Sequence, residues 1–161
     1  MSTPVDYIGR AYDLLALRGA QPIGEVLLTQ ALFDTQDAGQ ICTGAQKVAQ
    51  RWVLRFLTIS GSKRFAPLDG CNFMALVKQG ALRTETDVFT QFSFAAMDVH
   101  QQLLAIETPE MHAEDRFASA TLDSIVLSLT GISLHIVIRT LADTARAVIL
   151  PIPILPNSLD N

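Results

Sequence analysis

The chain has 161 residues, 49% of them hydrophobic and only 17% charged, with a formal net charge of −4 at pH 7. This length predicts a single domain with a substantial core, and the negative charge argues against binding to a nucleic-acid backbone. Charged residues make up about 25% of an average soluble domain, so the apolar excess predicts a protein partner. The longest apolar run, residues 125–138, is interrupted by polar residues, which argues against a membrane span.

Neither the cysteines nor the histidines form a ligand pattern. Cys42 and Cys71 have no metal-ligand spacing and are expected to be reduced structural thiols. His100, His112 and His135 have neither an HExxH spacing nor cysteine companions. We therefore expect no metal and no cofactor.

The first half of the chain has a helical pattern. Residues 6–18 predict a marginal leading helix, and residues 21–44, which are rich in turn formers, predict an irregular arm. The clearest helix is expected over residues 43–59, with apolar side chains three and four apart. The Ser60-Gly61-Ser62 stretch predicts the end of this helix, and the next turn at residues 67–70 predicts a tight connection. A short helix over 72–79 and a longer one over 85–106 are expected to follow.

The period changes to that of strands after Arg116. Alternating apolar residues predict strands over about 122–129, 132–138 and 146–152, with a hairpin turn at Thr130-Gly131. In the last strand, Ala147 and Ile149 are expected to be the apolar positions. The fold class is therefore α+β, with an N-terminal helical half packed on a small C-terminal antiparallel sheet. We divide the chain into a leading helix and arm (1–43), an α+β domain (44–152) and a tail (153–161).

One cluster could carry chemistry: Glu107, Glu110, Glu114 and Asp115 lie close in sequence to His112. Glycosidases use two carboxylates at a fixed separation, but no further motif fixes such a geometry here. We therefore expect a solvated connection and no enzyme. Residues 61–70 contain two glycines, a lysine and an arginine, but in an order that does not match a phosphate-binding loop.

The predicted strands indicate that this chain assembles with another protein chain. A short sheet with apolar residues on both faces has one face for its helices and needs a second cover. An exposed sheet edge is also a template for a strand of another chain. The sequence therefore predicts strand exchange or sheet packing with a partner, whereas a fully closed sheet in an ordinary domain is the alternative.

The segment GAQKVAQRWVLRFLTISGSKRFAPLDGCNFMALV resembles the lysozyme-like baseplate wedge family, which includes the sheath initiators of contractile-tailed phages and a component of type VI secretion. The resemblance covers residues 44–152. The positions that are similar to the turn of that family are Thr58, Gly61, Ser62, Arg64, Pro67, Gly70 and Phe73. The Glu-Pro-Arg tripeptide of the family is matched by Glu114 and Arg116, but Asp115 replaces the proline.

The resemblance implies a structural subunit that initiates the tail sheath by offering a sheet edge to the first sheath ring. It implies that Glu114 and Arg116 bind partner helices and that Leu134, Ile136 and Ile138 pack against a partner. The implied partners are other wedge proteins and sheath subunits, with several copies in a ring, and no nucleic acid or membrane. The implied location is the virion baseplate, assembled in the host cytoplasm. A tail-completion or terminator ring subunit, a cell-wall hydrolase and a dimeric domain of another role remain the alternatives.

Overall fold

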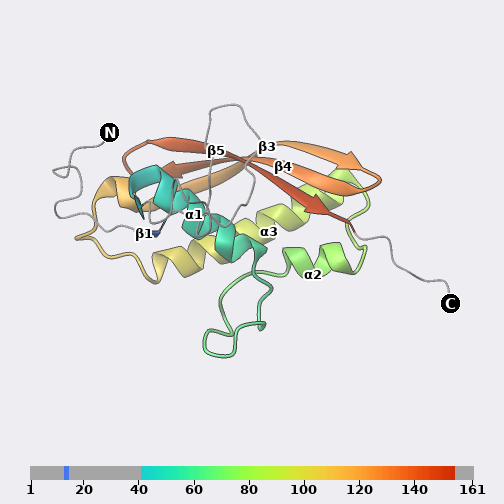
Figure 1. Cartoon of the computed structure of the whole chain (residues 1–161), viewed down its shortest axis with the longest axis horizontal. Helices are drawn as coiled ribbons and strands as arrows, with labels where there is room; N and C mark the ends of the chain where they lie inside the picture. Colours follow the sequence, from blue (N-terminus) through green and yellow to red (C-terminus); the bar gives the residue numbers. More distant parts are fainter. Residues whose placement is uncertain (1–12, 15–40, 155–161) are drawn as a thin grey trace, which may run out of the picture.

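The computed structural model describes residues 13–14 and 41–154. Its main body has two layers, with three helices packed under one face of a three-stranded antiparallel sheet (Figure 1). This arrangement confirms the predicted α+β class. The helices come first in the chain and the sheet last, as the change of hydrophobic period indicates.

The first helix, α1 (Gly44–Leu57), buries the apolar side that its spacing predicts, including Val48, Trp52, Val53 and Phe56. It begins where expected and ends two residues earlier than residue 59. Thr58 is extended, and its carbonyl accepts the N–H of Cys71 at 2.9 Å. Its hydroxyl donates to the carbonyl of Leu54 at 2.7 Å. The prediction that the Gly61 region caps the helix is therefore wrong, because a pairing with residue 71 ends it first.

The next two helices are α2 (Phe73–Lys78) and α3 (Glu85–Leu104). Gly80 has a positive φ of 66° just after α2, as a helix-ending glycine requires. α3 begins with a capping box, in which Thr84 and Asp87 bond reciprocally. Both predicted helices are confirmed to within two residues at either end.

The sheet has the order β3-β4-β5, made of β3 (Phe117–Ser128), β4 (Gly131–Thr140) and β5 (Ala145–Pro153). The hairpin between β3 and β4 closes at the Ser128↔Gly131 pair, so its turn residues are Leu129 and Thr130, one position before the predicted turn. Register shifts between 117 and 119 and between 122 and 124 place β-bulges in β3. These bulges let a 12-residue strand keep its apolar positions on the inner face.

The inner face of the sheet is buried against the helices. From β4 it contributes Ile132, Leu134, Ile136 and Ile138, and from β5 it contributes Val148, Leu150 and Ile152. The prediction for β5 is therefore wrong by one residue, since Ala147 and Ile149 lie on the other face. The alternation in residues 146–153 fits either phase, because nearly every position is apolar.

A cluster of aromatic rings joins the helices. Trp52 stacks on Phe56 with ring centroids 4.8 Å apart, and Phe56 contacts Phe73 of α2 and Phe92 of α3 at 4.8 and 5.6 Å. These rings are all buried. Burying a phenylalanine contributes about 1.5 to 3 kcal/mol, so the cluster holds α1, α2 and α3 together beneath the sheet.

Little of the N-terminal region is described. β1 (Asp13–Leu14) pairs with β2 (Ile41–Cys42) in a two-stranded antiparallel ladder. Residues 13–14 are therefore a short strand and not part of the expected helix over 6–18. The rest of that helix, the arm up to residue 40 and the tail from residue 155 lie outside the described residues.

Candidate assembly surfaces

The outer edge of β5 is poor in hydrogen-bond donors. In an antiparallel pair, successive residues point their N–H and C=O groups alternately toward the neighbouring strand and away from it. The N–H of Ile154 donates to the carbonyl of Thr130 at 2.9 Å, which continues the β4–β5 ladder. The even-numbered residues of β5 therefore face β4, and Pro151 and Pro153 face outward. Because proline has no N–H, an added strand would lack two donors there.

The outer edge of β3 is different. Because Ser128 and Gly131 close a two-residue hairpin, Ser128 and Val126 face β4. Ile125 and Leu127 therefore point their N–H and C=O groups outward, and no other part of the chain within residues 41–154 bonds to these groups. β3 contains no proline, and its register is regular from 124 to 128. This short stretch can accept a strand from another chain.

The side chains of Leu134, Ile136 and Ile138 do not lie on a partner surface. All three are buried in the core of this chain, on the central strand β4, under the helices. The partner-packing role expected for them is therefore corrected to a core role. The other face of β4 carries Ser133, His135, Val137 and Arg139, so it is mixed and not apolar as expected.

The Glu114-Asp115-Arg116 segment follows a 3-10 turn, η3 (Ala113–Asp115), that leads into β3. Asp115 is buried, and its Oδ1 accepts the N–H of Gly44 at the start of α1 at 2.7 Å. Thr43, the N-cap of α1, makes no side-chain cap. A carboxylate at this position satisfies a free N–H and interacts favourably with the helix dipole. The residue that departs from the family pattern therefore has a structural role that sequence reasoning missed.

Arg116 and Glu114 are half-buried beside it. Nε of Arg116 is buried without a hydrogen-bond partner in the described part of the chain, and the same holds for Nε of Arg55. Glu107 lies near Arg116, and both of its carboxylate oxygens accept the N–H of Phe117, at 3.1 and 3.0 Å. Burial raises the pKa of Glu107, against the opposing effects of the Phe117 hydrogen bond and of the electrostatic interactions with Arg51, Arg116 and His100.

The turn residues of the family resemblance form a projection, which we call the finger (residues 60–70). It extends from the helical layer on the side opposite the sheet (Figure 1). The tight connection expected after α1 is therefore wrong. Gly61 donates to the carbonyl of Pro67 at 2.9 Å across the finger. At its base, Gly70 has φ +94°, and a Cβ there would lie 2.2 Å from the carbonyl oxygen of Thr58.

α3 holds the finger at its base. The side chain of Gln102 accepts the N–H of Gly70 at 2.9 Å and donates to its carbonyl at 2.7 Å. Ser62 donates its N–H to the carbonyl of Ile59 at 3.1 Å, and Lys63 pairs with Asp69 at 3.1 Å. Arg64 lies at the exposed end, where its guanidinium carbon is 5.6 Å from the Phe65 ring centroid. The predicted turn residues thus shape a braced loop.

The acidic residues around His112 do not form one site, because they contact different parts of the fold. Glu107 binds the start of β3 and Asp115 binds the start of α1, while Glu110 and His112 are exposed. Among the described residues, no group of three or more His, Cys, Asp or Glu side chains is placed to hold a metal ion. Cys42 and Cys71 are buried free thiols whose pKa values burial raises to about 11, which makes them poor nucleophiles.

Comparison with family models, with curated proteins and with solved structures finds no match to this chain. Within the described helices, none is both long enough and apolar enough to cross a membrane. The resemblance to the baseplate wedge family therefore stays a hypothesis drawn from the residues themselves.

Proposed function

We propose that this chain is a non-enzymatic structural subunit that assembles by offering the outer edge of β3 to a strand of a neighbouring chain. In its specific form, the subunit belongs to the baseplate wedge of a contractile tail and initiates the sheath. The observation that carries the proposal is the difference between the two sheet edges. Proline blocks the edge of β5, whereas Ile125 and Leu127 keep outward N–H and C=O groups on β3.

Strand addition at β3 would use main-chain hydrogen bonds for affinity and side chains for register. Each hydrogen bond contributes about 1 kcal/mol net, so four bonds from two residues give a modest attachment that apolar contacts must support. Val126 and Leu129 supply them, because both are exposed apolar side chains at the same end of β3. The bulge at residue 123 limits the added strand to the neighbourhood of 124–128.

The experiment is to co-express the chain with the proteins encoded beside it and to image the purified complex by electron microscopy. Density against the first sheath ring is expected. The Leu127→Pro variant removes one outward N–H donor of β3, so baseplates that contain it should not assemble a sheath. Its matched control, Ile149→Pro, removes an outward donor from the edge of β5, which two prolines already block, and should retain the sheath.

Other outcomes would overturn the proposal. Density at the opposite end of the tail would favour the terminator alternative. A normal sheath on Leu127→Pro baseplates would rule out strand addition at β3. Cell-wall hydrolysis by the purified chain, lost in Glu107→Gln, would contradict a non-enzymatic role.

A further inference from the structure

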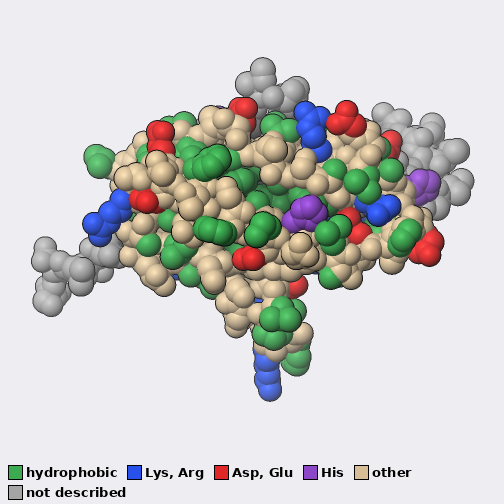
Figure 2. Space-filling view, turned by 180° about the vertical axis from the view of Figure 1, so that it is seen from behind, with side chains coloured by type: hydrophobic (Ala, Val, Ile, Leu, Met, Phe, Trp, Pro, Cys, Tyr) green, Lys and Arg blue, Asp and Glu red, His purple; other side chains and the backbone are tan. Residues whose placement is uncertain are grey.

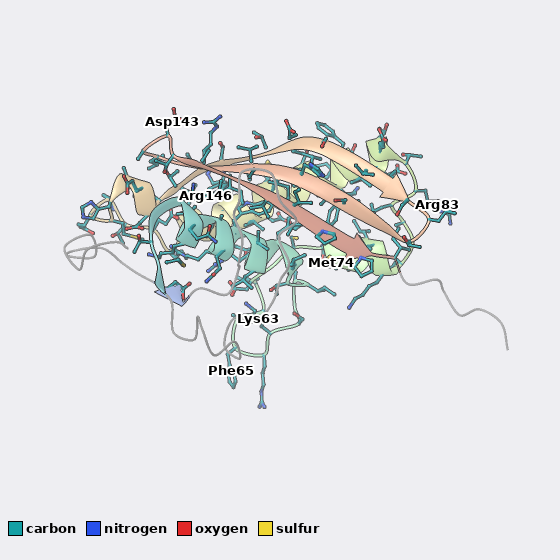
Figure 3. All side chains as sticks on the ribbon, turned by 45° about the horizontal axis from the view of Figure 1, so that its top comes forward. Lys63, Phe65, Met74, Arg83, Asp143 and Arg146 are labelled. Atoms are coloured by element: carbon teal, nitrogen blue, oxygen red, sulfur yellow. The ribbon has the colours of Figure 1, made fainter. Side chains whose placement is uncertain are left out.

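The finger exposes large apolar side chains at its free end. Phe65 is 94% exposed and Leu68 is 84% exposed, and Figure 3 shows Phe65 at the end of the projection, away from the body. Isolated exposed apolar residues are common, but two of them on one projecting loop form a candidate contact. Each would contribute about 1.5 to 3 kcal/mol if it were fully buried.

The finger is also built to keep its shape. Gln102 bonds to both backbone groups of Gly70, Gly61 bonds across to Pro67, and Lys63 pairs with Asp69. A loop that is ordered before it binds loses less conformational entropy on binding. The finger therefore has both the surface and the rigidity of a docking element.

The outer side of α3 presents a matching surface. Its exposed apolar side chains, each between 48% and 60% exposed, are Phe89, Phe94, Met97 and Leu104. Phe94, Met97 and Leu104 lie on the side of α3 away from its buried residues, and Phe89 lies at the flank of that side. Exposed polar residues, including Thr90, Ser93 and Gln101, lie among them. Several large exposed apolar side chains on one helix mark a candidate contact surface. Figure 2 shows hydrophobic side chains across this back face of the molecule and again on the projection below it.

The two surfaces have opposite charge. α3 contains no lysine or arginine, and Glu85 and Asp98 are exposed beside its apolar side chains. The finger carries Lys63 and Arg64 against a single carboxylate, Asp69. Because Asp69 is already paired with Lys63, Arg64 brings positive charge to the exposed end that no carboxylate within residues 41–154 balances. Complementary charge of this kind guides docking and fixes orientation.

We propose that the finger of one copy of this chain docks on the outer side of α3 of a second copy. Phe65 and Leu68 pack among the apolar side chains of α3, and Arg64 lies near Asp98. One chain carries both halves of the contact, so self-association needs no other protein. The contact is independent of the proposed β3 edge, because the finger projects from the side of the molecule opposite the sheet.

The test is sedimentation velocity of the full chain over a wide range of concentrations. The wild type is expected to self-associate reversibly, and Phe65→Asp to weaken the association constant by on the order of tenfold or more. The matched control is Leu141→Asp, which changes a half-exposed leucine between β4 and β5 and should leave association unchanged. Because Phe65 is almost fully exposed, its replacement should leave the fold intact, as circular dichroism would verify.

A charge exchange identifies the second surface. Arg64→Glu alone and Asp98→Arg alone should each weaken association by about threefold, and a mixture of the two variants should recover it. A photoreactive phenylalanine analogue at position 65 should crosslink to residues 85–104 of another copy. Crosslinks elsewhere, or association unaffected by Phe65→Asp, would overturn the proposal.

Two further outcomes would also overturn it. One is a wild type that stays monomeric at every concentration. The other is Phe65-dependent binding to phosphatidylglycerol vesicles without self-association, which would make the finger a membrane-contacting loop. Neither outcome bears on the β3 edge, which the Leu127→Pro variant tests separately.

Discussion

Asp115 and Gly44 are 71 residues apart in the chain, yet Oδ1 of Asp115 accepts the N–H of Gly44 at 2.7 Å. Both residues are buried. The bond joins the turn before β3 to the first residue of α1, so it fixes the helical half against the start of the sheet. It also places a carboxylate at the positive end of the α1 dipole.

Removing this carboxylate should destabilise the fold. We expect Asp115→Ala to lower the free energy of unfolding by about 1.5 to 3 kcal/mol, because the N–H of Gly44 would be left buried without its charged acceptor. Asp115→Asn, which keeps an acceptor oxygen, should cost less. Urea unfolding measures both. Glu110→Ala, in an exposed part of the same connection, is the control and should change stability by less than about 0.5 kcal/mol.

The helices could be predicted because their signals are local. The three-and-four spacing from Val48 to Phe56, the Thr84 capping box and the glycine after α2 each depend on residues within one or two turns. The hairpin and the strand alternation are local as well. These features were enough to give the fold class and most element boundaries.

The assembly surfaces could not be predicted, because they depend on contacts between residues that are far apart in the sequence. In sequence, Asp115 only replaces the proline of the family tripeptide, whereas in the fold it is buried and bonds to Gly44. Leu134 has the same hydrophobic signal whether it packs on its own helices or on another chain, so the sequence could not assign its face. The sequence predicts a tight connection in place of the finger, because the residue that holds the finger, Gln102, is 32 positions from Gly70.

Two glycines of the finger should differ in their tolerance of alanine. Both have positive φ, but a Cβ at Gly61 meets nothing within 4 Å, whereas one at Gly70 lies 2.2 Å from the carbonyl oxygen of Thr58. Gly61→Ala should therefore cost only the left-handed strain of about 1 kcal/mol. Gly70→Ala should cost about 3 kcal/mol or more, because the pairing with Thr58 must shift. Equal losses in urea unfolding would contradict this packing at the base of the finger.

Glu107 should make stability fall as the pH rises. Burial raises its pKa in the folded chain above the ordinary value of 4.5, so the native state keeps this proton to a higher pH than the unfolded state does. The resulting stability is fully present below pH 4.5 and is lost as the pH rises through the folded pKa. Glu107→Gln can still accept the N–H of Phe117 and has no proton to lose. The stability of this variant relative to the wild type should therefore increase with pH, and a constant difference would count against the shift.

Two neighbouring prolines would verify which groups of β3 face outward. Val126 points its N–H toward β4, so Val126→Pro should break the ladder and cost about 3 kcal/mol or more. Leu127 points its N–H away from β4, at the open edge, so Leu127→Pro should lose no hydrogen bond to β4. Its loss in unfolding free energy should be clearly smaller than that of Val126→Pro, once the effect of losing the leucine side chain is subtracted. Leu127→Ala and Val126→Ala supply that correction, and urea unfolding of all four variants gives the comparison. A larger corrected loss for Leu127→Pro would reverse the assigned direction and would remove the open edge on which strand addition depends.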